Sequence, residues 1–225
     1  MLSTTGSQTK KKSHFWQSLR HELKTPLVNI KALPQLIEWE KIDGDNKLFL
    51  EESLSAAQEL GTKMDRIFEA WQLETEPLTI QTEIITLEAF IKNIHPPKNL
   101  CIHYPKNLTQ KIKVDVPLMR KAWKEIINNA AFFNTEESRL HITVTKEKQK
   151  IIMKFQDNGI GIAPEHQKSI FDMLFVVSKS RNQVESGTGV GLAITQHIIQ
   201  AHGGTIEVTQ SEKNKGTTLQ IEIPT

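Results

Sequence analysis

The apolar residues of this chain change their spacing at Pro77, and this change divides the sequence into two parts. In the first part they recur at alternating steps of three and four residues, which is the period of a helix packed against other helices. The residues of this seam are Trp16, Leu19, Leu23, Pro26, Ile30, Leu33 and Ile37. In the second part, runs rich in β-branched residues alternate with helical stretches. The sequence therefore predicts an α+β fold in which a helical part precedes a part built on a sheet.

A second helical seam follows residues 43–46, whose sequence DGDN is typical of a turn and should end the first helix. Its members are Leu50, Leu54, Ala57, Gly61, Met64, Phe68 and Trp71, widened by Leu60 and Ile67. The two segments predict a helical hairpin. One hairpin leaves half of each seam in water, whereas two hairpins form a four-helix bundle that covers both seams. We expect a homodimer through residues 13–73; the alternative is a hairpin that packs on the C-terminal part of its own chain.

We expect four segments along the chain. They are a basic tail at 1–12, the hairpin at 13–74, a hinge at 75–80 and a second domain at 81–225. In the second domain, strands are expected at 140–145, 151–155, 205–209 and 217–223, and helices at 117–133 and 189–202. This order favours a mostly antiparallel sheet with helices on one face.

The composition limits which binding partners and which cellular compartment we expect for this chain. The formal net charge is +2, from 28 basic and 26 acidic residues, which is too small a global field to argue for a nucleic-acid partner. The single cysteine, Cys101, cannot form an internal disulfide and fits a reducing compartment such as the cytoplasm. No apolar run approaches the roughly 20 residues that cross a bilayer. The basic run at 10–12 is either a solvated tail or the cytoplasmic flank of a membrane segment outside this chain.

One histidine stands apart from the helical seam. With Trp16 at heptad position a, His21 falls at position f, away from the seam, so we expect an exposed imidazole. Glu22 follows it directly, and Thr25 lies one helical turn along. Pro26 removes the helical hydrogen bond to the carbonyl of Glu22 and should bend the helix just past His21. A zinc-protease helix would need a second histidine where Thr25 stands, so these residues are not a metal site.

Two glycine-rich groups are candidates for a phosphate-binding site. The first, at 157–162, follows a predicted strand, and the second, at 187–192, opens a predicted helix. Glycine-rich loops that lead into a helix offer unpaired N–H groups and a favourable dipole to phosphate oxygens. The candidate residues are Asp157, Gly159, Gly161, Ile162, Gly187, Thr188, Gly189, Val190, Gly191 and Leu192. At the end of a strand, Asp157 can accept a hydrogen bond from an adenine amino group.

A third candidate element lies on the helix predicted at 117–133. Glu125 and Asn129 are four residues apart and therefore share one helix face. Their oxygen atoms suit Mg²⁺, which prefers carboxylate and carbonyl ligands and keeps several waters. Taken alone, the pair would be no more than a solvated helix face. Its order along the chain with the two glycine groups makes it a candidate.

Residues 21–27, His-Glu-Leu-Lys-Thr-Pro-Leu, resemble the phosphoacceptor box of sensor histidine kinases. The resemblance implies that His21 takes the γ-phosphoryl group of ATP. It also implies that Glu22 orients the imidazole and receives a proton, and that Thr25 places water for dephosphorylation of the partner protein. A neutral imidazole has one free lone pair, and a carboxylate bonded to its other nitrogen fixes the tautomer, which agrees with these roles.

The helix and the two glycine groups resemble, in order, the N, G1 and G2 boxes of the ATP-binding domain of these kinases. This domain is of the GHKL (Bergerat) type, an α/β sandwich shared with gyrase, Hsp90 and MutL. The resemblance implies ATP and Mg²⁺ as cofactors, with Asn129 and Glu125 at the metal and Asp157 at the base. Residues 170–175 fall where the family has its F box, and Thr217 is expected to support Asp157.

The activity implied by the resemblance is a two-component phosphorelay. His21 would be autophosphorylated by ATP, and the phosphoryl group would pass to an aspartate of a response regulator receiver domain. The family position of Thr25 leaves open a phosphatase activity toward the regulator. An upstream sensor domain, anchored in a membrane or not, is expected outside this chain. An ATP hydrolase of the gyrase-like kind is an alternative, in which Glu125 acts as a base on water.

Some positions depart from the family pattern. Phe132 stands where many relatives carry a lysine that neutralises phosphate, and Val176 and Val177 replace lid residues that are often Arg or Thr. Lys179 and Arg181 are candidates to replace the missing charge. The departures leave open a further alternative, a degenerate kinase that binds nucleotide and scaffolds its partner without phosphoryl transfer.

Overall fold

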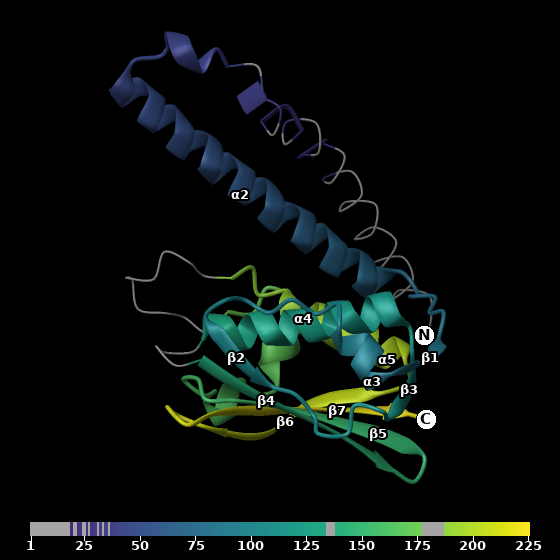
Figure 1. Ribbon diagram of the computed structural model, residues 1–225. Helices are drawn as coiled ribbons and strands as arrows, with labels where there is room; N and C mark the ends of the chain where they lie inside the picture. The colour runs from purple at the N-terminus through teal and green to yellow at the C-terminus, as the bar shows by residue number, and fades with distance from the viewer. Residues whose placement is uncertain are drawn as a thin grey trace, which may run out of the picture. The chain divides into compact units, whose positions relative to one another are not determined.

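The computed structural model of the chain describes residues 37–133, 138–176 and 187–225 (Figure 1). It also describes Leu19 and residues 22–23, 26, 28–30, 32 and 34–35. The chain forms two compact units, Met1–Thr75 and Glu76–Thr225.

The N-terminal unit is helical throughout its described part apart from a short connection. The described residues between 19 and 35 are helical, and a single turn of 3-10 helix, η1 (Trp39–Lys41), precedes the long helix α2 (Gly44–Thr75). The predicted break at 43–46 is therefore displaced, because Gly44 already begins α2. Asp43 explains the difference: its Oδ1 accepts a hydrogen bond from the N–H of Asn46 at 3.1 Å. Short polar residues favour helix caps as strongly as they favour turns.

The buried side of α2 follows the predicted period. Leu54, Gly61, Phe68 and Trp71 are buried, and the other seam residues are half-buried. Leu60, which we expected to widen the seam, is 55% exposed in the single chain, and one hairpin is expected to leave half of its seam in water, so its place in the seam stays a prediction. The homodimer through residues 13–73 stays a prediction.

The C-terminal unit is built on a five-stranded sheet in the order β2-β4-β5-β7-β6. Its strands are β2 (Leu100–His103), β4 (Ser138–Glu147), β5 (Lys150–Asp157), β6 (Thr205–Glu212) and β7 (Gly216–Pro224). Only the β2–β4 pair is parallel. A separate two-stranded antiparallel sheet pairs β1 (Glu83–Thr86) with β3 (Lys111–Val114). The predicted α+β fold is confirmed, and each of the four predicted strands is present and longer than expected.

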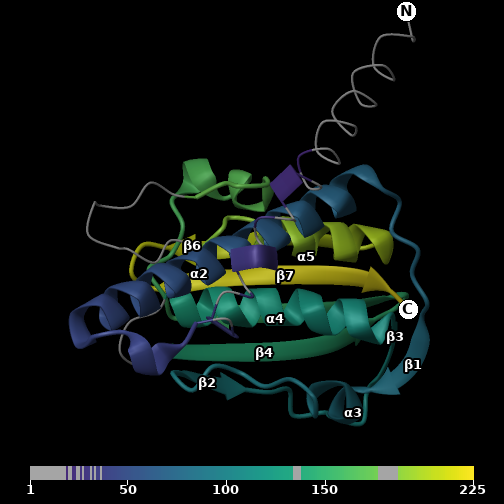
Figure 2. The same ribbon diagram turned by 90° about the horizontal axis from the view of Figure 1, so that it is seen from above.

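Two helices, α4 (Val116–Phe132) and α5 (Gly191–Ala201), lie side by side on one face of the five-stranded sheet (Figure 2). Three shorter elements complete the unit: α3 (Leu87–Ile91), η2 (Pro164–His166) and η3 (Ser169–Phe171). Trp123 of α4 is fully buried, and its ring makes edge contacts with Phe90 and Phe155 at centroid distances of 5.0 and 4.9 Å. Through this aromatic cluster, α4 packs against β5, the middle strand of the sheet.

A buried polar joint fixes the ends of the two helices. The Oδ1 atom of Asp115 caps α4 by accepting from the N–H of Leu118 at 3.1 Å. The backbone N–H of Asp115 donates to Nε2 of His202 at 2.9 Å, while Nδ1 of His202 lies 2.7 Å from the carbonyl oxygen of Ile198. The imidazole therefore accepts through Nε2, which leaves Nδ1 to donate to the carbonyl of Ile198. The joint holds the start of α4 against the end of α5.

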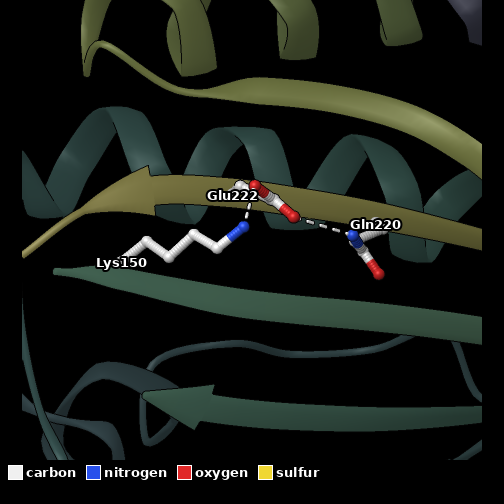
Figure 3. A network of polar contacts seen from close by, with 3 residues as sticks. All are labelled: Lys150, Gln220 and Glu222. Carbon is white, nitrogen blue, oxygen red and sulfur yellow. Dashed lines mark hydrogen bonds and ion pairs between the residues drawn. The ribbon is translucent and has the colours of Figure 1, made fainter. Parts of the chain in front are cut away.

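The opposite face of the sheet is polar. Figure 3 shows Nζ of Lys150 in β5 paired with Oε2 of Glu222 in β7 at 2.7 Å, and Nε2 of Gln220 donating to Oε1 of Glu222 at 3.0 Å. The hydrogen bond to Glu222 raises the pKa of Lys150 above its ordinary value. The C-terminal unit thus has two layers, with α4 and α5 on one face of the sheet and polar side chains on the other. None of the helices in the described ranges is long and apolar enough to cross a membrane.

Candidate nucleotide site

The central residue of the candidate site is Asp157, the last residue of β5. Its Oδ1 atom accepts two backbone hydrogen bonds, from Gly159 at 2.8 Å and from Thr217 at 3.1 Å. Burial raises the pKa of Asp157, and the hydrogen bonds from Gly159 and Thr217 oppose this rise without cancelling it. The structure thus brings Thr217 to Asp157 and Gly159, although Thr217 lies sixty positions after Asp157 in the sequence.

The first glycine loop lies tightly against the turn between β6 and β7. Gly161 has a φ of +70°, and a Cβ atom on it would overlap the carbonyl oxygen of Glu212. Gly216, at the end of the turn, has a φ of +95°, and its Cβ would overlap the carbonyl oxygen of Asp157. The N–H of Asn214 donates to the carbonyl of Ile160 at 2.8 Å. Both glycines are therefore required by the close approach of two backbones.

Ser211 is a residue of this site that the sequence analysis missed. Its Oγ atom accepts a hydrogen bond from the N–H of Ile162 at 2.7 Å and lies 2.9 Å from Oγ1 of Thr217. The predicted strand ended at Thr209, whereas β6 continues to Glu212. A hydroxyl residue just before the turn was the only available sequence signal, and it does not reveal which strand residue faces Thr217.

The second glycine group forms the approach to α5. Gly187 is exposed, Thr188 and Gly189 are half-buried, and Val190 is buried at the N-cap of the helix, which begins at Gly191 and continues through Leu192. The side chain of Val190, the N-cap residue, makes no capping hydrogen bond at this helix end. The carbonyl of Gly189 accepts from the N–H of Leu174 at 2.9 Å, which ties the loop to the segment after η3.

This loop contains a buried hydroxyl that fits a phosphate ligand. Oγ1 of Thr188 is buried and has no hydrogen-bond partner among the described atoms. Buried polar atoms are nearly always paired, and an exception calls for a missing partner such as a ligand or water. Together with the uncapped N–H groups at the start of α5, it offers the hydrogen-bond donors that phosphate oxygens need.

The predicted magnesium residues share one face of α4. Glu125 and Asn129 are both half-buried. The end of α4 is joined to the first glycine loop, because the carbonyl of Asn129 accepts from Phe133 at 3.0 Å and the carbonyl of Phe133 accepts from Ile160 at 3.2 Å. In the described ranges, no three His, Cys, Asp or Glu side chains gather closely enough to hold a metal ion. The donor set fits a Mg²⁺ that is shared with phosphates and water, because Mg²⁺ needs only one or two protein oxygens.

Most of the predicted phosphoacceptor residues cannot be compared with the structure. His21 and Thr25 lie outside the described residues, as do Val177, Lys179 and Arg181, so their roles stay predictions. Glu22 is helical and exposed. At the nucleotide site, Phe132 is 39% exposed and its ring packs edge-on against Phe133 at 4.9 Å, while Val176 is 41% exposed.

The chain is similar to known proteins over nearly all its length. Residues 114–225 match the family described as histidine kinase-, DNA gyrase B- and HSP90-like ATPase. The signal transduction histidine-protein kinase ArlS of Staphylococcus aureus is 33% identical over 98% of this chain and 51% of its own length. The chain thus spans about half the length of the curated relatives it matches.

Solved structures share the fold of this chain. Full-length ShkA, in complex with AMPPNP, has a TM-score of 0.78 at 20% identity and covers 94% of this chain and 45% of its own. The histidine kinase AdeS of Acinetobacter baumannii has a TM-score of 0.61 at 21% identity and covers 91% of this chain and 97% of its own.

Proposed function

Because the chain belongs to the sensor histidine kinase family, we propose that it is a phosphotransfer core in which ATP phosphorylates His21. The phosphoryl group then passes to an aspartate of a response regulator receiver domain. Two observations carry the nucleotide part: the N–H of Thr217 donates to the carboxylate of Asp157, and the second glycine loop holds a Thr188 hydroxyl that is buried and unpaired among the described atoms.

The base end and the phosphate end of the site have separate tasks in this proposal. Both loop hydrogen bonds to Asp157 reach Oδ1, so Oδ2 is assigned to the amino group of adenine. The N–H groups that start α5 and the hydroxyl of Thr188 bind phosphate oxygens. Asn129 and Glu125 hold Mg²⁺, which supplies charge neutralisation on the phosphates.

The transfer step requires positioning more than chemistry from the protein. One ring nitrogen of His21 attacks the γ-phosphorus in line, the P–O bond to ADP breaks, and ADP leaves with the bonding electrons. Glu22 accepts a hydrogen bond from the other ring nitrogen, fixes the tautomer and takes the proton as the ring becomes cationic. The exposure of Glu22 supports a site that a separate domain can reach.

The domain assignments belong to the same proposal. Residues 13–74 form the dimerisation and phosphotransfer hairpin, 75–80 the hinge, and 81–225 the catalytic domain that swings to His21, with 1–12 as a basic tail. The proposal also includes a sensor region outside this chain that drives the swing. The proposed compartment is the cytoplasm, where ATP is abundant and a free exposed thiol such as Cys101 stays reduced.

The test is incorporation of label from [γ-³²P]ATP. We expect acid-labile, alkali-stable label in the wild-type protein and none in His21→Gln, with equal ADP binding by both proteins. Label that persists in His21→Gln would overturn the assignment of the phosphoacceptor. Binding of ADP without label in the wild type would instead support a scaffold, the second candidate, which the exposed Phe132 in place of a lysine favours. Steady phosphate release that is unchanged in His21→Gln would support an ATP hydrolase with Glu125 as its base.

A further inference from the structure

A β-bulge in β6 decides which side chain faces Thr217. Along the β6–β7 pair, Val208 lies opposite Leu219, Gln210 opposite Thr218, and Ser211 opposite Thr217, with an irregularity between Val208 and Gln210. Strict pairing from Val208 onward would have placed Gln210 opposite Thr217. A bulge adds one residue to one strand, and a shift of one residue moves each side chain to the other face. Ser211 therefore shares the face of Thr217.

The contacts of Ser211 indicate where its single proton goes. Its Oγ atom accepts from the N–H of Ile162 at 2.7 Å, and two acceptors are within reach of its own O–H. Oγ1 of Thr217 lies at 2.9 Å and the carbonyl oxygen of Gly216 at 3.4 Å. A hydroxyl has one proton, and O–H···O distances cluster below 3.0 Å. The Ser211 hydroxyl therefore donates its hydrogen bond to Oγ1 of Thr217. The O–H of Thr217 then points away from Ser211.

This direction matters because Thr217 also holds the carboxylate of Asp157 through its backbone N–H, at 3.1 Å. An acceptor, the carboxylate, and a donor, the Thr217 hydroxyl, then stand next to each other. Adenine presents a donor, its 6-amino group, beside an acceptor, the ring nitrogen N1. The protein pair and the adenine edge are complementary only if Thr217 donates.

We propose that Ser211 is a positioning residue for base selection. Its hydroxyl accepts from the first glycine loop and donates to Thr217, and it thereby turns the Thr217 hydroxyl into a donor for N1 of adenine. The inference rests on the proposed ATP-binding function. It concerns a residue that does not itself touch the nucleotide.

The test compares ADP with 1-deaza-ADP, which lacks the N1 acceptor and keeps the 6-amino group for Asp157. Dissociation constants are measured by calorimetry on the whole chain with Mg²⁺. We expect the wild type to prefer ADP by about tenfold, the worth of one hydrogen bond. In Ser211→Ala the preference should fall below about twofold, and Ser211→Thr, which keeps the hydroxyl, should restore it. Thr205→Ala, which removes an exposed hydroxyl from the same strand, is the matched control and should keep the full preference.

The outcomes separate this inference from the function on which it rests. If the wild type binds neither nucleotide, the proposed function fails. If the wild type binds both nucleotides equally, or if Ser211→Ala weakens both by the same factor, Ser211 has only a structural role and the inference is overturned. Should Ser211→Ala not fold, Ser211→Cys, of similar size and with a weak donor, must show the reduced preference in its place; a full preference would contradict the proposal.

Discussion

The two glycine groups look alike in the sequence but stand in different states in the folded chain. The first, with Asp157, is closed by the protein itself, because its N–H groups, carboxylate and neighbouring turn are bonded to one another. The second carries a buried hydroxyl without a partner among the described atoms, and the N-cap residue of the helix that follows makes no side-chain capping bond. The proposed base end is thus already assembled in the protein alone, whereas the proposed phosphate end would be completed by its ligand. Selection of a base requires a fixed pattern of hydrogen-bond donors and acceptors. Release of phosphate requires hydrogen bonds that the protein does not hold in place without the ligand.

The largest effect should come from adding one methyl group at the assembled end. Gly161→Ala places a Cβ on the backbone carbonyl of Glu212 at a positive φ, which we expect to cost about 2–4 kcal/mol in the free energy of unfolding and to abolish ADP binding. Gly187→Ala is the matched variant at the other end, because no described atom lies within 4 Å of its Cβ. It should change stability by less than about 0.5 kcal/mol. Urea unfolding measures both, and equal losses would erase the distinction between the two ends.

The next effect concerns the charge of Asp157. Asp157→Asn keeps an oxygen for the N–H groups of Gly159 and Thr217 but sets an amide NH₂ against the adenine amino group. ADP should bind about 10- to 100-fold more weakly, which is the range for a lost charge-assisted hydrogen bond. Calorimetry with ADP and Mg²⁺ checks this, and unchanged affinity would remove Asp157 from the base site.

The same variant has a pH signature. The pKa of Asp157 is raised in the folded protein, so its contribution to stability is fully present below the ordinary Asp value of 3.8 and is lost as the pH rises through the folded pKa. We therefore expect the stability of Asp157→Asn, relative to wild type, to increase from pH 4 toward pH 7. Urea unfolding across this range measures the difference, and the opposite slope would mean that the hydrogen bonds outweigh burial.

A smaller effect is expected at the phosphate end. Thr188→Val removes the unpaired buried hydroxyl without changing the side-chain volume much, so the free protein should be unchanged or more stable by up to about 1 kcal/mol. Affinity for ATP should fall about five- to tenfold. Thermal unfolding with and without ATP separates the two effects. A destabilised free protein would indicate that the hydroxyl has a protein partner and that this end is also assembled without ligand.

The sequence predicted what is local and missed what depends on strand register. Asp157 and the glycine groups were recognisable because strand ends and helix starts carry their signals in consecutive residues. Ser211 could not be recognised in this way, because a bulge of one residue decides whether Ser211 or Gln210 faces Thr217. The sequence of β6 contains no pattern that predicts the bulge. The short elements between 83 and 114 were also missed, because runs of four or five residues are too short to show a period.

The smallest effect should follow a change on the far face of the sheet. Lys150→Ala removes the ion pair with Glu222, which is exposed to solvent and therefore contributes little. Nucleotide affinity should be unchanged, and the melting temperature should fall only slightly. Because its partner raises the pKa of Lys150, this small contribution is fully present at neutral pH and is lost only when the pH rises beyond the ordinary lysine value of 10.5. A change in ADP affinity in Lys150→Ala would show that the two faces of the sheet are coupled, and the base end would then not be a locally closed assembly.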